Sequence, residues 1–358
     1  MSRLETLQSV LKEKDVDAAI ISSELNQRYI SGLHFSDGYI LVTQSEGYLI
    51  TDSRYIEIAK RTVTNMNVLL ANKPMKEMLW DIIKKKQIKR VGVEEDELSL
   101  AAYKSFKATF EDCKILSVVS EILKELRAVK SADELLIIEK AQSITDAAFS
   151  HILEIITPNM TENDVALELE FFMRKNGADG LAFETIAVSG AASSLPHGKP
   201  SDVKLRKGFL TMDFGATYNG YCSDMTRTVC IGKADEEMKT VYNTVLAAQR
   251  TALENIKGGM SCRDADALAR DIIREAGFGA NFGHSLGHGV GMYIHESPSL
   301  SPKAAEGAVL KPGNVVTVEP GIYLEGKFGC RIEDMITILP DGGIRNFTKS
   351  TKELIEIL

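Results

Sequence analysis

A chain of 358 residues, with 44% hydrophobic and 26% charged residues, has the composition of a folded globular protein. It exceeds the length over which one hydrophobic core usually extends, so two domains are expected. The formal net charge of -8 argues against sequence-independent binding to nucleic acid, which needs a basic surface, and no run approaches the roughly 20 apolar residues of a membrane helix, so no membrane partner is expected.

The five cysteines are odd in number, widely scattered, and never spaced as a Cys-x-x-Cys pair. Neither a disulfide framework nor a zinc finger is therefore expected. The first residues of the chain carry charges every few positions and lack the apolar segment of a signal peptide. We therefore expect a reduced protein located in the cytoplasm.

Residues 1–125 alternate between helical and extended patterns, which predicts a small α/β domain. The elements predicted in chain order are a helix from Leu4 to Leu11, a strand at 17–22, a hairpin of 39–43 with 48–51, helices after Ser53, Met75 and Leu98, and a strand at 91–93. A strongly charged stretch at 124–134 then precedes a long amphipathic helix that begins near Ser131. We place the domain boundary there, which gives domains at 1–125 and 126–358.

The second domain contains an internal repeat of low similarity. Five residues recur 100 positions later: Met160, Thr161, Asp164, Arg174 and Gly177 correspond to Met260, Ser261, Asp264, Arg274 and Gly277. Each copy predicts a helix that begins at a hydroxyl N-cap and ends at a glycine. A similar strand follows each, with Thr-x-Asp-x-Gly at 211–215 and Thr-x-Glu-x-Gly at 317–321. Two such units predict an α+β domain with pseudo-twofold symmetry and a site between the copies.

Two acidic residues of the first copy are predicted to share one face of a hairpin. Asn219 and Gly220 form a tight-turn signal after the apolar run that contains Asp213. Pairing about this turn makes Asp213 and Asp224 diagonal neighbours, about 7 Å apart at Cβ. This separation allows the two carboxylates to share a metal ion.

The second copy repeats this arrangement with Glu319 and Glu333, which lie symmetrically about Gly326. All four acids have apolar surroundings. Four carboxylates on half-buried hairpins would repel one another and would be costly to desolvate unless cations neutralised them. The symmetrical set therefore predicts a metal site.

Three of the six histidines fall within one short segment, as His284, His288 and His295, and His197 lies in a Leu-Pro-His-Gly sequence. His288 lies between Gly287 and Gly289, which leaves room for close approach of backbone and substrate. One imidazole with four carboxylates is an oxygen-rich donor set that suits Mn²⁺, Co²⁺ or Fe²⁺ at least as well as Zn²⁺. Two such ions, roughly 3.5–4 Å apart, would activate water for hydrolysis.

Several other catalytic motifs are absent. The glycines around His288 do not have the Gly-x-Gly-x-x-Gly spacing, and the chain contains no phosphate-binding P-loop. Gly-x-Ser-x-Gly and His-Glu-x-x-His are also missing. A dinucleotide site, a serine nucleophile on a sharp turn and a helical zinc site are therefore not expected.

The motifs MDFGATYNGYCSDMTRT, HSLGHGVGMYIHESP, VEPGIY and CRIED resemble those of the pita-bread metallopeptidases. This family includes methionine aminopeptidase, Xaa-Pro aminopeptidase, prolidase and the metal-free creatinase. The resemblance implies two divalent metal ions, with Mn²⁺ expected and Co²⁺, Zn²⁺ or Fe²⁺ as alternatives. The residues that match the ligand positions are Asp213, Asp224, His288, Glu319 and Glu333. Asp224 and Glu333 match the ligands that bridge both ions.

The resemblance also assigns roles to residues outside the ligand set. His197 and His295 match histidines that bind substrate and stabilise the tetrahedral intermediate, and Arg331 matches a further catalytic position. Glu319 is expected to shuttle a proton as well as to bind metal. His284 and Tyr323 are expected to bind substrate in the pocket.

Residues 1–125 resemble the creatinase/prolidase N-terminal domain, including Ile50 to Tyr55, and simple methionine aminopeptidases generally lack this domain. Arg331 and Tyr323 match the proline-specific branch. The complete ligand set argues against metal-free hydrolysis and against a non-catalytic binding protein. The resemblance implies a homodimer that cleaves Xaa-Pro bonds in peptides with a metal-bridging hydroxide. We favour an Xaa-Pro aminopeptidase, with an Xaa-Pro dipeptidase (prolidase) as the alternative.

Overall fold

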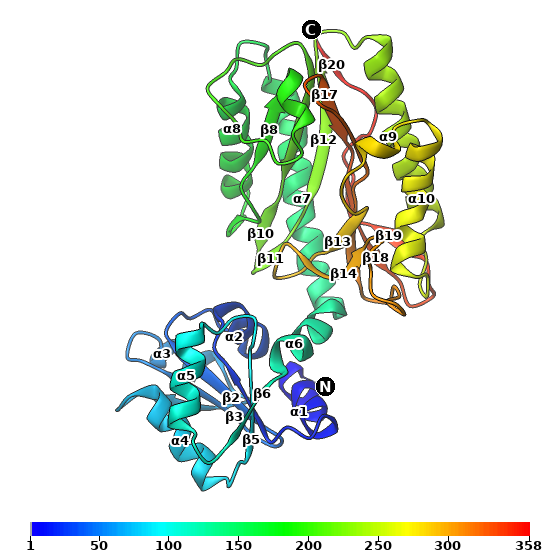
Figure 1. The fold of residues 1–358 in the computed structure, drawn as a ribbon. Coiled ribbons are helices and arrows are strands. Elements are labelled where there is room, and N and C mark those ends of the chain that lie inside the picture. The colour runs from blue at the N-terminus through cyan, green and yellow to red at the C-terminus, as the bar shows by residue number, and fades with distance from the viewer. Residues whose placement is uncertain (1) are drawn as a thin grey trace. The chain divides into compact units, whose positions relative to one another are not determined.

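The computed structural model describes residues 2–358 and divides into two compact units, Met1–Leu126 and Arg127–Leu358 (Figure 1). None of the helices in residues 2–358 combines the length and the apolar composition needed to cross a bilayer.

The first unit is built on a six-stranded sheet with the order β4-β3-β2-β1-β5-β6. Its strands are β1 (Ala18–Ile21), β2 (Gly38–Thr43), β3 (Gly47–Thr51), β4 (Asn67–Leu70), β5 (Arg90–Val93) and β6 (Lys114–Ser117). Its helices are α1 (Arg3–Glu13), α2 (Glu24–Ser31), α3 (Ile56–Thr62), α4 (Met75–Lys85), α5 (Leu100–Thr109) and the start of α6 (Val119–Ala128), which runs across the division between the units. The predicted 39–43 and 48–51 hairpin is confirmed, because β2 and β3 pair antiparallel. β1 is central and buried along its whole length, as its apolar sequence requires.

The first half of the second unit comprises α7 (Ala132–Ile155), α8 (Glu162–Lys175) and a sheet with the order β20-β12-β9-β8, in which β20 (Glu356–Ile357) is contributed from much later in the sequence. The other elements of this half are β7 (Gly180–Leu181), β8 (Ile186–Ser189), η1 (Gly190–Ser194), β9 (Gly208–Phe214), β10 (Ala216–Tyr218), β11 (Tyr221–Cys222) and β12 (Met225–Ile231). Apolar side chains of α7 and α8 share one buried cluster with those of β9 and β12. The helices therefore cover this sheet, as Figure 1 shows.

The second half repeats the plan with α9 (Glu236–Asn255), α10 (Cys262–Glu275) and a sheet with the order β14-β13-β15-β18-β19. Its other elements are η2 (Gly279–Asn281), β13 (Gly287–Gly289), β14 (Glu296–Leu300), β15 (Val315–Val318), β16 (Gly321–Leu324), β17 (Phe328–Arg331), β18 (Asp334–Ile338), β19 (Ile344–Asn346) and β20 (Glu356–Ile357). A second buried cluster joins α9 and α10 to these strands. The strands of both halves thus lie between the two helix pairs, as Figure 1 shows.

The helix caps predicted from the repeat are confirmed. Thr161 Oγ1 and Ser261 Oγ each accept a hydrogen bond from a backbone N–H three residues later, at 3.0 Å in both copies. Gly177 and Gly277 follow the two helices with φ angles of 101° and 89°, a conformation that favours glycine. The two copies therefore begin and end their helices by the same local interactions.

Both predicted hairpin registers are also confirmed. Tyr218 pairs with Tyr221 across the turn, and the same register continues into β9 and β12, where Asp213 lies opposite Thr226. Asn219 and Gly220 have φ angles of 46° and 79°, as a tight hairpin turn requires. In the second copy Gly321 pairs with Arg331, in the register centred on Gly326.

A buried ion pair links the two halves of the second unit. Arg227 on β12 donates to Asp334 Oδ1 on β18 at 2.8 Å, and the two side chains are 2% and 1% exposed. Lys352 Nζ donates to Asp334 Oδ2 at 2.7 Å. Arg227 also donates to the backbone oxygens of Ser350 and Thr351. Arg227 and Asp334 therefore hold residues 350–352 against β12 and β18.

We expect Asp334→Ala to lower the free energy of unfolding by about 3–5 kcal/mol, because it leaves the Arg227 guanidinium buried without a counter-charge. Urea denaturation followed by circular dichroism measures this loss. Glu353→Ala is the control, since the ion pair of Glu353 with Arg250 is exposed and contributes little. Equal losses in the two variants would contradict the prediction.

Candidate metal centre

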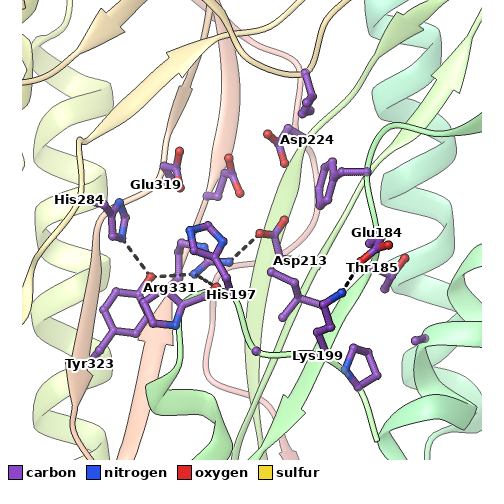
Figure 2. A pocket seen from close by; sticks show the side chains of 18 of the residues that line it. Glu184, Thr185, His197, Lys199, Asp213, Asp224, His284, Glu319, Tyr323 and Arg331 are labelled. Atoms are coloured by element: carbon purple, nitrogen blue, oxygen red, sulfur yellow. Dashed lines mark hydrogen bonds and ion pairs between the residues drawn. The ribbon is translucent and has the colours of Figure 1, made fainter.

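A cavity of about 1530 Å³ lies within the second unit and is lined by both of its halves. All ten side chains predicted to form the site line it: His197, Asp213, Asp224, His284, His288, His295, Glu319, Tyr323, Arg331 and Glu333. Figure 2 shows Asp213, on β9, and Asp224 and Glu319, next to the ends of β12 and β15, pointing toward one region of this cavity.

Three of the predicted ligands approach one another closely. One ligand atom each from Asp224, His288 and Glu333 lies within 4.8 Å of the other two. His288 Nε2 is also 3.4 Å from Glu319 Oε1 and 3.5 Å from Asp224 Oδ2. These residues come from both halves of the repeat, so the site forms where the halves meet.

The protonation of His288 can be assigned from its hydrogen bonds. Its Nδ1 lies 3.0 Å from the backbone oxygen of Gly289, which can only accept, so Nδ1 carries the proton. Burial lowers the pKa of His288 and favours the neutral ring. The lone pair of Nε2 therefore faces the carboxylate oxygens of Asp224 and Glu319. A cation between them converts this repulsive arrangement into ligation.

The glycines around His288 allow its strand to fit between two neighbours. A Cβ atom on Gly287 would lie 2.0 Å from the backbone oxygen of Thr317, and one on Gly289 would lie 2.4 Å from that of Ser297. The His288 backbone N–H donates to Thr317 Oγ1 at 3.0 Å, and this hydroxyl donates to Glu319 Oε1 at 3.2 Å. Thr317 thus connects the histidine and the glutamate.

Two carboxylate oxygens in the site are buried without a hydrogen-bond partner among residues 2–358: Asp213 Oδ1 and Glu333 Oε1. The other oxygen of each carboxylate is held in place. Asp213 Oδ2 accepts from Arg331 Nη2 at 2.6 Å, and Glu333 Oε2 accepts from Thr226 Oγ1 at 2.7 Å. Buried polar atoms are normally satisfied, so these oxygens fit the positions of metal-binding atoms.

The electrostatics of the cluster lead to the same conclusion. Burial raises the pKa of Glu319 to about 8. Burial, and then the neighbouring carboxylates, raise the pKa values of Asp224 and Glu333 well above their usual range. Arg331 is one buried cation beside four acids, so positive charge from elsewhere is needed to keep all four ionised. Divalent ions fit this requirement and the nitrogen and oxygen donors present.

Arg331, Tyr323 and His284 form a directed hydrogen-bond chain, drawn in Figure 2. Arg331 Nη1 donates to the Tyr323 hydroxyl at 2.7 Å. His284 Nδ1 donates to the backbone oxygen of Ser285 at 2.8 Å, so Nε2 accepts from the tyrosine hydroxyl at 3.0 Å. Burial lowers the pKa of His284 to about 4, which keeps the ring neutral. The chain ends at Asp213 and holds the guanidinium in one orientation.

His197 and His295 line the cavity outside the predicted ligand set. The rings of His295 and His288 have centroids 4.4 Å apart and an interplanar angle of 62°. His197 lies in the loop after η1, and Figure 2 shows it beside Arg331. Both imidazoles can therefore reach a molecule held in the cavity.

The sequence analysis missed Thr226 and Thr317, which hold predicted ligands by hydrogen bonds. The signal for both was the two-residue period of a strand. Thr226 is two residues from Asp224, and Thr317 is two residues from Glu319. The two side chains of each pair are therefore expected on the same face of a strand or of the residues that continue it. Residue type alone did not distinguish them from other buried threonines.

Comparison with known proteins identifies the class. Residues 137–340 match metallopeptidase family M24, and residues 3–129 match the creatinase/prolidase N-terminal domain. The chain belongs to the M24 family of metallopeptidases and carries the N-terminal domain of creatinase and prolidase. These findings confirm the predicted family and fold. They also confirm the prediction of a hydrolase that depends on divalent metal ions.

Individual relatives are similar over almost the whole chain. The Xaa-Pro dipeptidase of Pyrococcus furiosus is 38% identical over 355 residues, which cover 99% of each chain. The structure of an Xaa-Pro dipeptidase from Bacillus anthracis has a TM-score of 0.94 and 40% identity, covering 99% of this chain and 98% of that one. The structure of an X-Pro aminopeptidase from Thermotoga maritima has a TM-score of 0.90 and 38% identity, covering 96% and 98%.

Proposed function

We propose that the protein is a two-metal peptidase that hydrolyses the bond before proline. The proposed metal ligands are Asp213, Asp224, His288, Glu319 and Glu333, with 126–358 as the catalytic domain and 1–125 as its N-terminal domain. The observation that carries the proposal is the convergence of these donors on one cavity, where buried oxygens of Asp213 and Glu333 have no hydrogen-bond partner within residues 2–358.

Dipeptides of the form Xaa-Pro are the proposed substrates. The sequence motifs led us to favour an aminopeptidase, whereas the names of the Pyrococcus furiosus and Bacillus anthracis relatives support the alternative, a dipeptidase. An Xaa-Pro aminopeptidase is the second candidate. It is supported by the name of the Thermotoga maritima structure and by the cavity volume of about 1530 Å³, which exceeds the roughly 300–1,000 Å³ typical of small-ligand pockets.

Bound divalent ions would polarise the scissile carbonyl and lower the pKa of a water molecule. Residues of the chain position the ligand atoms and the proton acceptor for this reaction. His288 presents an unprotonated Nε2, and Arg331 fixes Asp213 through one oxygen. Thr317 holds Glu319 Oε1, which leaves Oε2 to accept a proton from the attacking water and to return it to the proline nitrogen as the peptide C–N bond breaks. His197 and His295 are proposed to donate hydrogen bonds to the substrate carbonyl oxygen as negative charge develops there.

Manganese is the proposed ion, because four of the five donors are carboxylates. A homodimer located in the cytoplasm is the proposed state of the enzyme. The resemblance to the proline-specific branch supports the dimer.

Three peptides test the substrate assignment: Ala-Pro, Ala-Pro-Ala and Met-Ala-Ala, each incubated with Mn²⁺ and with a chelator. We expect Mn²⁺-dependent cleavage of Ala-Pro, detected as free proline by chromatography. Cleavage of Ala-Pro-Ala alone would select the aminopeptidase. Cleavage of Met-Ala-Ala alone, or equal activity in the chelator, would contradict the proposed function.

A further inference from the structure

We propose that Thr226 is a positioning residue of the metal centre, whose hydroxyl fixes the Glu333 carboxylate and, through Arg331, the Asp213 carboxylate. The inference rests on the proposed two-metal function and assigns a role to a residue outside the ligand set.

Thr226 lies where the two halves of the repeat meet. It is directly opposite Asp213 in the β9–β12 ladder and two residues from Asp224, so its side chain shares their region of the sheet. The side chain is fully buried. Its backbone oxygen accepts the N–H of Glu333 at 3.1 Å, which brings the two residues together across the halves.

The direction of each hydrogen bond of this hydroxyl can be assigned. Arg331 Nε lies 2.9 Å from Thr226 Oγ1, and a guanidinium can only donate, so the hydroxyl oxygen accepts there. The single hydroxyl proton is then available for Glu333 Oε2, at 2.7 Å. The hydroxyl therefore links a cation to a carboxylate and cannot be replaced by an apolar group without loss of both bonds.

Arg331 extends this link to the other half of the site. Its Nη2 donates to Asp213 Oδ2 at 2.6 Å while its Nε is held by Thr226. One oxygen of Glu333 and one of Asp213 are thereby fixed. The other two oxygens, Glu333 Oε1 and Asp213 Oδ1, are buried and have no hydrogen-bond partner in the part of the chain that the structure describes. Such support aims ligand atoms before the metal arrives and strengthens its binding.

The competing interpretation is that Thr226 only packs in its strand, as β-branched residues commonly do. Thr226→Val keeps the shape of the side chain and removes the hydroxyl. The matched control is Thr211→Val on β9, because Thr211 is also buried, lies two residues from Asp213, and has a hydroxyl that contacts Thr228 Oγ1 at 3.2 Å instead of a ligand.

Isothermal titration calorimetry of chelator-treated full-length proteins with MnCl₂ tests the inference. We expect wild type, Thr211→Val and the conservative Thr226→Ser to bind Mn²⁺ with similar affinity. We expect Thr226→Val to bind about 10–100-fold more weakly. Its melting temperature without metal should be no higher than that of Thr211→Val, because it also leaves Arg331 Nε and Glu333 Oε2 without this hydrogen-bond partner.

The outcomes distinguish the positioning role of Thr226 from the proposed two-metal function. Wild-type affinity in Thr226→Val would overturn the positioning role and leave the two-metal function standing. Failure of the wild type itself to bind Mn²⁺ would overturn the proposed function. If Thr226→Val does not fold, Thr226→Ala, which removes the hydroxyl without adding a methyl group, is titrated with the same two outcomes.

Discussion

Asp224→Ala and His288→Ala are each expected to abolish peptidase turnover while the chain keeps its fold. Asp224 and His288 contribute ligand atoms to the closest group of donors in the site. Polarising the carbonyl and activating water are each worth several kcal/mol, so a loss on the order of 1000-fold in kcat/KM is expected. Hydrolysis of Ala-Pro with excess Mn²⁺ measures the loss, and circular dichroism monitors the fold.

His151→Ala is the matched control for His288→Ala. His151 pairs with Glu168 at 2.7 Å on α8 and is not among the residues that line the cavity. We expect this variant to retain activity close to that of the wild type. Full turnover in Asp224→Ala or His288→Ala would show that the donor assignment is wrong.

Removal of divalent ions is expected to produce the second large effect, a loss of stability in the unit Arg127–Leu358. Metal at 100 times its Kd stabilises a folded protein by about 2.7 kcal/mol, or roughly 5–10 °C for a domain of this size. Glu333→Gln separates charge repulsion from ligation. Because it removes one buried negative charge, it should melt at or above the wild-type temperature in chelator, yet gain little from Mn²⁺. Scanning calorimetry measures both quantities.

Glu353→Gln serves as the control, since the Glu353 side chain is exposed at 75% and outside the cavity. This variant should show the same Mn²⁺-induced shift as the wild type. If Mn²⁺ does not change the wild-type melting temperature, the acidic cluster does not bind this cation as predicted. If Glu333→Gln responds to Mn²⁺ as strongly as the wild type does, Glu333 is not a ligand of the cation.

Much of the fold follows from local sequence signals. Asn219 and Gly220 fix the first hairpin register, and the repeated helix caps at Thr161 and Ser261 fix where two helices begin. These signals depend on neighbouring residues, so the sequence was sufficient to place Asp213 opposite the right part of β12.

The second hairpin has a feature that local sequence signals do not predict. Its register is continuous, but the strands divide into the β15–β18 pair and the separate β16–β17 sheet. Pro320, which lacks a backbone N–H, stands at this break. The break interrupts the pairing of the hairpin next to Glu319. The internal symmetry of the sequence located Glu319 but does not predict this interruption.

Side-chain orientation within the site depends on contacts between distant parts of the chain. Arg331 could equally be an exposed cation paired with Glu333 or Asp334 when the sequence is considered alone. In the structure it is buried and directed to Asp213, with Tyr323 and Thr226 fixing its other nitrogens. This arrangement requires the two halves to pack together, which no local pattern encodes.

Anomalous X-ray diffraction from Mn²⁺-soaked crystals of the full-length protein tests whether these five side chains hold two metal ions. We expect two manganese peaks about 4 Å apart, contacted by Asp213, Asp224, His288, Glu319 and Glu333. Glu333→Gln crystals soaked in the same way provide the comparison and should show reduced occupancy. Absence of manganese from this cluster in the wild-type crystals, or peaks only elsewhere, would show that these residues do not form a metal centre.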